Sequence, residues 1–212
     1  MKQILFVLLF ATSCIFAKSA PKTHDGFFLN GVLGLGYGNY TEEYKNDGIK
    51  LQSEGSQIGL GIKVGAAIIQ NFILHGNIEI TTFAEDLKAE TWDQEKIDNI
   101  LEKDNFVKTM FLGGGVTYYL PSDLNIYLSA SLGAVIYTEY YVEFLGKRKK
   151  LSTHDSSVGF ILSFGKEWWV NNELGIGVAA SYKQSSTNSK FLDYKGDTSF
   201  KAASIAVSLT FN

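Results

Sequence analysis

The sequence predicts an all-β protein, an eight-stranded antiparallel up-and-down transmembrane β-barrel. Three observations favour this fold class: eight segments in which apolar and small polar residues alternate, connections that alternate in length, and an export signal at the N-terminus. The 212 residues are 45% hydrophobic and 19% charged, which suits one domain with a sizeable core. The formal net charge of −3 is too small to indicate a nucleic acid as partner.

The N-terminus has the layout of a secretory signal peptide. It carries one lysine, an apolar run over 4–10 and small residues after that run. We expect cleavage after Ala17 or Ala20, because a small residue precedes the cut in such signals. The predicted division of the chain is a signal peptide over 1–17, a short periplasmic segment over 18–26 and the outer-membrane barrel domain over 27–212.

Cys14 is the only cysteine of the chain. A lipoprotein reading, with an acyl group on Cys14, is disfavoured because Ala11 stands where such a cleavage box usually has leucine. A chain cut after Ala17 has no cysteine. Disulfides and thiolate metal sites are therefore excluded from the predicted mature protein.

The first four alternating segments each have one apolar face and one face of glycine and small polar residues. In the third segment, for example, Ile78 and Ile80 flank Glu79, which lies on the other face. Each segment is long enough to cross a bilayer when tilted. The predicted strands are 28–40, 56–68, 72–83 and 109–120.

The last four segments keep the same alternation. In the fifth, Leu128 and Leu132 share one face and Ser129 lies on the other. The closing segment, "SIAVSLTFN", is the strictest, since every second residue is apolar up to Phe211. The predicted strands are 124–140, 157–170, 174–183 and 204–212.

The connections between these strands alternate between short turns and long polar loops. Turn-forming residues join strands 2 and 3 at Gln70 and Asn71, strands 4 and 5 at 121–123, and strands 6 and 7 at 171–173. The other four connections are predicted to be polar loops of about fourteen to twenty-five residues. This arrangement predicts a barrel with extracellular long loops and both termini in the periplasm.

Alternation alone fits a soluble lipocalin-like barrel equally well, because that fold has an apolar interior and a wet exterior. The composition of the less apolar face separates the two. That face consists mostly of glycine, alanine, serine, threonine and tyrosine with a few isolated charges, which suits a crowded lumen better than open water. The apolar face also has aromatic residues near strand ends, as an aromatic girdle would, at Tyr37, Tyr118, Tyr140, Trp168 and Tyr182.

Over 27–211 the chain resembles the small eight-stranded outer-membrane proteins of the OmpA/OmpX type. Its C-terminal alternation resembles the signal that those families present to the outer-membrane insertion machinery, although Asn212 makes Phe211 penultimate. The resemblance implies a multi-pass protein of the Gram-negative outer membrane, in contact with lipid and lipopolysaccharide. It carries over the fold and the location, but it assigns no active site. We expect a monomer without cofactors. An extracellular ligand is a further candidate partner.

An eight-stranded barrel is just wide enough for its interior side chains to fill. The predicted inward-facing charges are Lys63, Glu79, Glu139, Glu167 and Lys183. A turn centred on Asn71 would place Lys63 directly opposite Glu79, and we predict an ion pair between them that plugs the lumen. The alternative is a narrow ion or solute path.

Two predicted loops are strongly charged. The 84–105 segment has eight acidic residues against three lysines, with Ile97, Ile100 and Leu101 at helical spacing. It is either a solvated loop or a surface for a receptor, a divalent cation or adhesion. The second loop contains four cations that suit lipopolysaccharide phosphates, although such a cluster also serves solubility alone: Lys147, Arg148, Lys149 and Lys150.

One constellation suggests catalysis. His154 and Ser156 resemble the His-x-Ser arrangement of outer-membrane lipid A deacylases, with Glu139 as the candidate residue that orients the histidine. The spacing is weak, so we do not predict an enzyme. His24 and His75 are too isolated for a metal site. Three function classes remain, in this order: a structural or surface-interaction barrel, a narrow channel, and a lipid A-modifying esterase.

Overall fold

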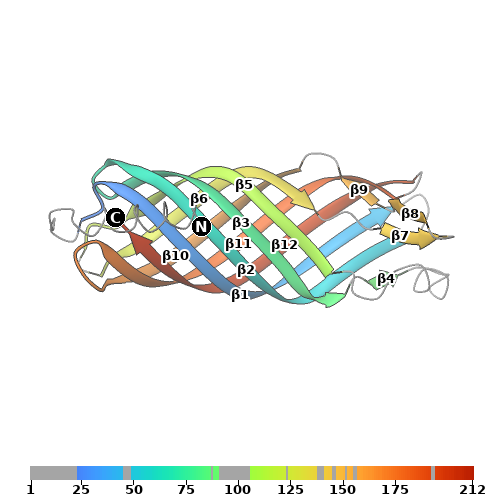
Figure 1. Ribbon diagram of the computed structural model, residues 1–212, viewed down its shortest axis with the longest axis horizontal. Helices are drawn as coiled ribbons and strands as arrows, with labels where there is room; N and C mark the ends of the chain where they lie inside the picture. The colour runs from blue at the N-terminus through green and yellow to red at the C-terminus, as the bar shows by residue number, and fades with distance from the viewer. Residues whose placement is uncertain are drawn as a thin grey trace, which may run out of the picture.

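The computed structural model is a closed barrel of eight long antiparallel strands (Figure 1). The structure describes residues 23–44, 49–86, 88–90, 106–122, 124–137, 141–144, 147–150, 152–154, 157–191 and 194–212. The barrel strands are β1 (Phe27–Tyr44), β2 (Ile49–Ile69), β3 (Phe72–Asp86), β5 (Phe106–Tyr119), β6 (Ile126–Tyr137), β10 (Ser157–Trp169), β11 (Leu174–Phe191) and β12 (Tyr194–Phe211).

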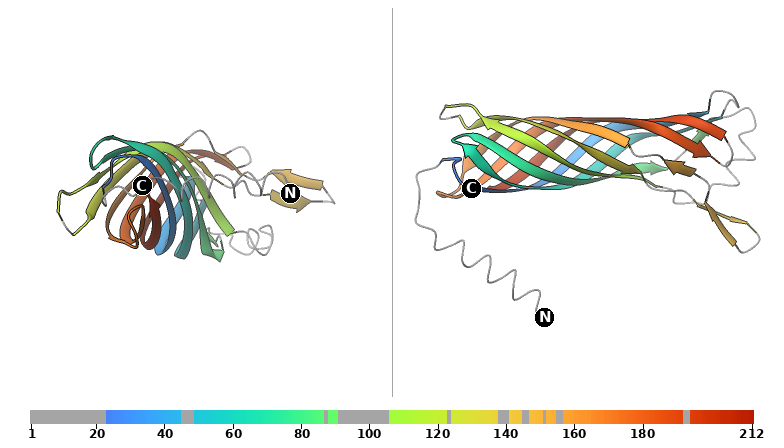
Figure 2. Two further views of the ribbon diagram at one scale, coloured as in Figure 1. Left: turned by 60° about the vertical axis from the view of Figure 1, so that its left-hand side comes forward. Right: turned by 90° about the horizontal axis from the view of Figure 1, so that it is seen from above.

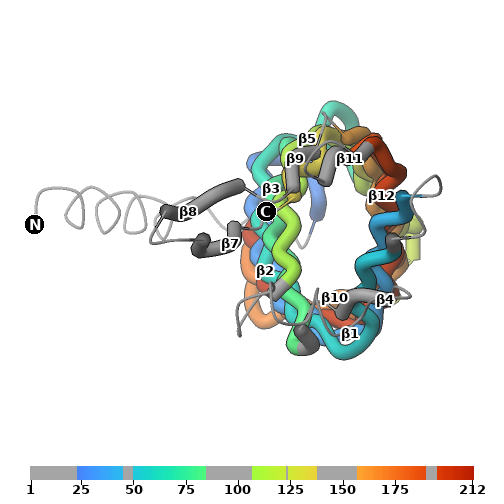
Figure 3. Tube along the Cα trace, turned by 90° about the vertical axis from the view of Figure 1, so that its right-hand side faces the viewer, coloured from blue at the N-terminus to red at the C-terminus, as the bar shows by residue number. Residues whose placement is uncertain are grey.

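Each barrel strand pairs with its two neighbours in the sequence, and β1 closes the ring by pairing with both β2 and β12. Figure 3 shows this ring along its axis. The closing register places Leu29 opposite Phe211 and Leu35 opposite Ile205, so the final alternating segment forms one side of the seam. The predicted fold class, an eight-stranded up-and-down barrel, is confirmed.

The barrel has two different ends. The turn end has the short connections after β2, β5 and β10, together with Asn212 (Figure 1). Asn71 and Asn125 both have positive φ angles there, of 67° and 52°, a backbone region that asparagine tolerates better than most residues. A bulge between Ala67 and Ile69 precedes the β2–β3 turn.

The opposite end, the loop end, bears four short strands (Figure 1). Strand β4 (Lys88–Glu90) pairs with β2, and β9 (Ser152–His154) pairs with β11. Strands β7 (Tyr141–Phe144) and β8 (Lys147–Lys150) form a separate hairpin. Within the described residues, no helix is long and apolar enough to span a membrane.

The apolar face of every barrel strand points outward. On β1, Leu29 and Leu35 are 40% and 66% exposed, whereas Asn30 between them is buried. Four of the five predicted girdle residues are exposed as well, and Tyr140 lies outside the described residues. An outward apolar belt over an interior that contains many buried polar residues is the pattern of a transmembrane barrel, and a lipocalin-like barrel shows no such outward belt.

Four adjacent strands are much longer than a bilayer crossing needs. Strands β1, β2, β11 and β12 have 18 to 21 residues, about twice the roughly 9–11 residues of a membrane-spanning strand. Beyond Tyr37, whose hydroxyl donates a 3.2 Å hydrogen bond to Glu54, the outward residues become polar. These strands form a wall that continues past the apolar belt at the loop end (Figure 2).

Two of the four predicted long loops are therefore wrong. The chain over 41–55 and 184–203 is mostly paired strand, and only 45–48 and 192–193 separate the members of each hairpin. The ladder continues through Glu43 opposite Lys50 and Ser189 opposite Gly196. The outward residues of these extensions are polar, so the alternation that marks a lipid-facing strand gave no sign of them.

Candidate functional site in the barrel lumen

The inward side chains form three layers along the lumen. Along β3 the order from the turn end is apolar Ile73, polar Asn77 and Glu79, then apolar Phe83, all buried. The turn-end cluster consists of Phe28, Ile73, Tyr119, Tyr127 and Ala179. The loop-end cluster consists of Tyr40, Tyr44, Leu51, Phe83, Val107, Phe111, Val135, Tyr137, Ile161, Phe200 and Ala202.

A glycine shapes the turn-end cluster. A Cβ atom at Gly165 would lie 2.4 Å from the ring of Tyr127, which is far inside van der Waals contact. Gly165 therefore leaves the space in which the Tyr127 ring crosses the lumen. The Tyr127 ring in turn lies 5.4 Å from that of Tyr119, centroid to centroid.

The middle layer is a hydrogen-bonded network on β2, β3, β5 and β6. The Lys63 ammonium donates to the Ser129 hydroxyl at 3.1 Å, and the Thr117 hydroxyl donates to the same oxygen at 2.9 Å. His75 Nε2 lies 3.0 Å from the Thr117 hydroxyl and acts as the donor there, because Thr117 already donates its proton to Ser129. The Lys63–Ser129 bond thus links β2 to β6, the second and fifth of the eight barrel strands.

An ion pair crosses the lumen next to this network. Glu79 on β3 accepts a hydrogen bond from the Lys183 ammonium on β11, and both side chains are buried. The Lys183 ammonium also lies 3.3 Å from the Thr81 hydroxyl. Strands β3 and β11 are the third and seventh of the eight barrel strands, so the pair spans the full width of the lumen. A buried charge pair of this kind is tolerated because each member compensates the other.

The predicted Lys63–Glu79 pair is wrong. Lys63 lies opposite Asn77 on β3, and Glu79 lies opposite Gly61 on β2. The reason is the turn: it is closed by two residues, 70 and 71, and the bulge at Ala67 and Ile69 shifts the register again. The shift moves Glu79 two positions along β2 but keeps both side chains on the inward face, which the alternation predicted correctly.

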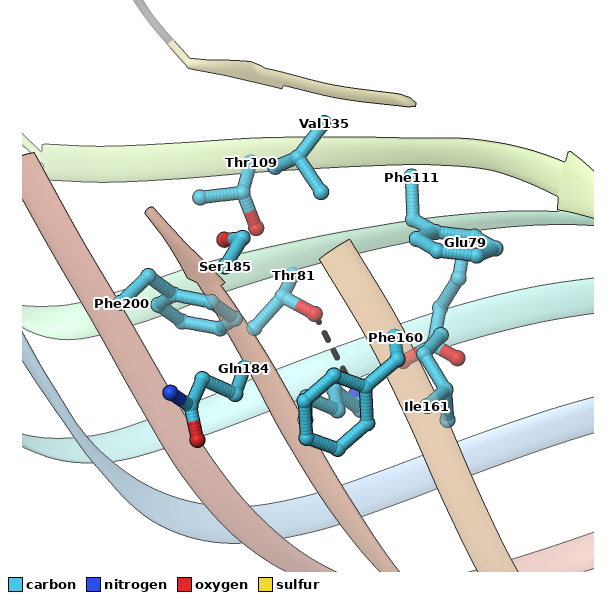
Figure 4. A pocket seen from close by; sticks show the side chains of 11 residues that line it. Glu79, Thr81, Thr109, Phe111, Val135, Phe160, Ile161, Gln184, Ser185 and Phe200 are labelled. Atoms are coloured by element: carbon cyan, nitrogen blue, oxygen red, sulfur yellow. Dashed lines mark hydrogen bonds and ion pairs between the residues drawn. The ribbon is translucent and has the colours of Figure 1, made fainter. Parts of the chain in front are cut away.

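A small cavity lies beside the ion pair, between it and the loop-end cluster (Figure 4). Its volume is about 20 Å³, enough for roughly one water molecule. Thr81, Thr109 and Ser185 contribute hydroxyl groups to its lining, while Phe111 and Phe200 contribute rings. The cavity thus has a mixed lining of hydroxyl groups and aromatic rings.

Glu167 is the charge nearest the turn end. It is buried on β10, and its Oε1 accepts a 2.6 Å hydrogen bond from the Thr210 hydroxyl. Asn30 donates to Thr210 in turn, at 2.7 Å. The chain of donors from β1 through β12 to β10 therefore holds the carboxylate against the turn-end cluster.

The four described charges of the spanning lumen alternate in sign. Glu167 lies two residues from the turn-end limit of its strand, Lys63 six, Glu79 seven and Lys183 nine. The two acids and two bases sum to zero, which limits the electrostatic cost of burying them. The fifth predicted inward charge, Glu139, lies outside the described residues.

Residues 23–26 cover the turn-end mouth. His24 is buried, and its Nε2 lies 2.8 Å from Asn125 Oδ1. The His24 ring also lies 4.9 Å from that of Trp169, centroid to centroid. This segment was predicted as part of a short periplasmic segment over 18–26. Nothing in its composition indicated that its histidine would enter the barrel.

A second buried carboxylate lies at the loop end. Glu42 on β1 accepts hydrogen bonds from the hydroxyl groups of Tyr40 and Tyr44, the latter at 2.7 Å, and all three side chains are fully buried. The three residues share the inward face of one strand. They extend the buried inward face of β1 beyond the level of the apolar belt.

The predicted catalytic residues are not brought together by the described structure. His154 ends β9, with its backbone opposite Ser189 on β11, while Ser156 and Glu139 lie outside the described residues. Residues 91–105, including the predicted helix positions Ile97, Ile100 and Leu101, also lie outside them. In the described part of the chain, no group of three potential metal ligands gathers.

The basic cluster forms a strand instead of a loop. Residues 147–150 are β8, which pairs with β7. Arg148 lies opposite Glu143, and Lys149 lies opposite Val142. The cluster therefore sits on a hairpin at the loop end (Figure 1).

No family model matches this sequence, and no curated protein does either. Several solved structures share the fold, and AlkL and OprG are two of them. The outer membrane protein AlkL, determined by solid-state NMR in DMPC bilayers, is 13% identical, with 92% of this chain and 94% of that chain covered and a TM-score of 0.56. OprG of Pseudomonas aeruginosa is 12% identical, with 91% and 100% covered and a TM-score of 0.55.

Both neighbours are outer-membrane proteins, and likeness at this identity speaks for the fold alone. The chain has the fold of the small bacterial outer-membrane β-barrels, as the resemblance to the OmpA/OmpX type implied. Its outward apolar belt agrees with a multi-pass position in that membrane.

Proposed function

We propose that the protein is a closed outer-membrane barrel that presents a surface-interaction structure at its loop end. In this proposal the loop end is extracellular and the turn end is periplasmic. The observation that carries it is the filling of the lumen by two apolar clusters with the Glu79–Lys183 pair between them. A lumen filled in this way suits an anchor better than a pore.

The wall of β1, β2, β11 and β12 supports a role at the surface. These strands continue well past the apolar belt and present polar outward residues such as Glu54, Asp197 and Lys201. A rigid paired wall can hold binding residues in place more precisely than loops alone. Together with the β7–β8 hairpin, it gives the loop end a structured surface of its own.

The basic residues of β8 suit anionic groups, and we propose lipopolysaccharide phosphates as their partner. Arginine pairs with phosphate through a bidentate fork, and lysine acts as a point charge. Changing Lys147, Arg148, Lys149 and Lys150 together to glutamine should lower the affinity of the refolded barrel for lipopolysaccharide at least tenfold. Unchanged affinity would remove lipopolysaccharide from the proposal.

The matched control for that experiment uses cations at the loop end of the barrel wall. Lys195 and Lys201 are exposed, and changing both to glutamine should leave the affinity for lipopolysaccharide within about twofold. Equal losses from the two sets of changes would mean that any positive charge near the rim suffices. In that case β8 would have no specific role.

A narrow channel is the second candidate, because four charges of alternating sign line the lumen from Glu167 to Lys183. Planar-bilayer recording separates the two. The closed barrel predicts no steady conductance for the wild type, whereas Phe111→Ala with Phe200→Ala, which opens the loop-end cluster, should produce openings. Steady conductance of the wild-type barrel would favour the channel. The control is the outward pair Leu112→Ala with Leu209→Ala.

The esterase remains the third candidate, resting on His154 and Ser156 in the sequence. A deacylation assay on purified lipid A tests it directly, with His154→Ala and Ser156→Ala as paired variants. Product formation that both variants abolish would establish the enzyme. We expect no product from the wild-type protein.

A further inference from the structure

The outer wall of the barrel has a groove of about 510 Å³ over β5, β6, β10 and β11. Two rows of outward side chains border it, each crossing the four strands in register. The row nearer the turn end is Tyr118, Leu128, Phe164 and Ala180. The row nearer the loop end is Val116, Ala130, Leu162 and Tyr182.

The hollow arises where small residues interrupt these rows. Ala130 and Ala180 are exposed, and each has much larger neighbours on the adjoining strand. The floor between the rows is the backbone of Ser129, Ser163 and Ser181, whose side chains lie on the other face of the sheet. The Ser163 and Ser181 hydroxyl groups bond to each other at 2.9 Å. The groove is consequently apolar along its borders.

The groove also has a direction within the membrane. Tyr118 is one residue from the turn-end limit of β5, and Ala180 is six residues inside the start of β11 at Leu174. Because barrel strands tilt by about 35–45°, a row that crosses them also changes depth. The groove starts at the turn-end edge of the apolar belt and rises toward its middle.

A cation lies at the turn-end side of the groove. Lys166 is an outward residue of β10, two positions from Phe164, in register with Ile126 and Val178. Its ammonium lies 5.4 Å from the centre of the Trp168 ring. In the described part of the chain, no carboxylate forms an ion pair with Lys166. Lys166 lies two residues inside the girdle residue Trp168, and a half-buried lysine at this depth can extend its ammonium toward lipid headgroups.

We propose that this groove is a binding site for one anionic phospholipid of the bilayer leaflet at the turn end. The headgroup phosphate pairs with Lys166, and one acyl chain lies between the two rows over Ser163. Charge-assisted bonding to the ammonium selects an anionic headgroup. The apolar borders favour an acyl chain, because a straight chain fills a furrow that the short alanine side chains leave open.

Native mass spectrometry tests the site on the intact barrel, released from vesicles of equal parts phosphatidylglycerol and phosphatidylcholine. The wild type should retain one lipid, with phosphatidylglycerol preferred at least threefold. Ala180→Phe fills the groove and should reduce retention of both lipids at least fivefold. Lys166→Gln should bring the preference close to one while some retention persists.

Two control variants lie outside the groove. Ala134→Phe adds the same ring at another exposed alanine of the belt, and Lys201→Gln removes an outward cation near the loop end. Both variants should retain the lipid, and prefer phosphatidylglycerol, as the wild type does. Ala130→Leu provides a second way to fill the groove if Ala180→Phe does not fold, as judged by the heat-dependent gel mobility of the barrel.

Three results would overturn the site. Wild-type barrels without retained lipid would show that the groove holds nothing tightly. Equal retention in Ala180→Phe or Ala130→Leu would place the lipid elsewhere on the belt. A dimer that is lost in these variants would show that a second copy of the chain covers the groove instead.

Discussion

His24 lies flat against Tyr119 inside the turn-end mouth, with ring centroids 3.4 Å apart and planes 13° apart. The backbone around it is fixed as well, since Asn71 N–H donates to the His24 carbonyl at 2.9 Å and Ala67 N–H donates to the Gly26 carbonyl at 2.8 Å. Burial lowers the pKa of His24, and its hydrogen bond to Asn125 offsets only part of that effect. A neutral imidazole thus lies in the turn-end mouth.

The burial of His24 predicts a pH dependence of stability. A histidine whose folded pKa is lowered stabilises the fold above its usual value of 6.5, and the contribution is lost as the pH falls through the folded value. Between pH 7 and 5 the free energy of unfolding should decrease, by at most about 1.4 kcal/mol per pH unit for this group. Urea-dependent folding in vesicles should show a shallower decrease for His24→Phe, which keeps the stack without the proton. Identical pH profiles would mean that His24 is not buried.

The second prediction concerns the assignment of the lipid-facing and inward faces, and it is tested with two residues of one strand. Val207 is 57% exposed near the middle of the belt on β12, whereas Ser204 points inward. Val207→Arg should cost about 2–4 kcal/mol of folding free energy in bilayers. Ser204→Ala should stay within about 1 kcal/mol. If the serine change were the more costly one in the same vesicle assay, the inward and outward faces would be exchanged.

Orientation in the membrane is a third prediction. Lys195 is exposed at the loop end and Asn172 at the turn end. A cysteine in place of Lys195 should react with an impermeant maleimide on intact cells, and one in place of Asn172 should react only after the cells are opened. Labelling of residue 172 on sealed cells would invert the barrel.

The sequence was sufficient for the strand phase within the belt. Leu128 and Ser129 were assigned to opposite faces, and they are 53% and 5% exposed. Alternation assigns the two faces correctly because a strand in the bilayer needs an apolar residue at every second position. This pattern is a local property of each strand. The extensions of β1 and β12 were missed by the same reasoning, because their outward residues are polar beyond the belt.

The pairing of charges inside the lumen was not available from alternation. Glu79 and Lys183 were both assigned to the lumen, but which strands face each other depends on closure of the ring. In an eight-stranded barrel the third strand faces the seventh, and this rule could have suggested the pair. The bulge at Ala67 and Ile69 has no comparable signal in the sequence, and it accounts for part of the register error.

The central claim is that the lumen is closed around a buried Glu79–Lys183 pair, and a double-mutant cycle tests it most directly. Removing one partner, by Glu79→Gln or Lys183→Met, leaves an uncompensated buried charge and should cost about 3–5 kcal/mol in vesicle folding. The double variant should recover much of that loss. Additive costs would contradict the claim, as would a coupling between Lys63→Met and Glu79→Gln that equals or exceeds the one between Glu79 and Lys183.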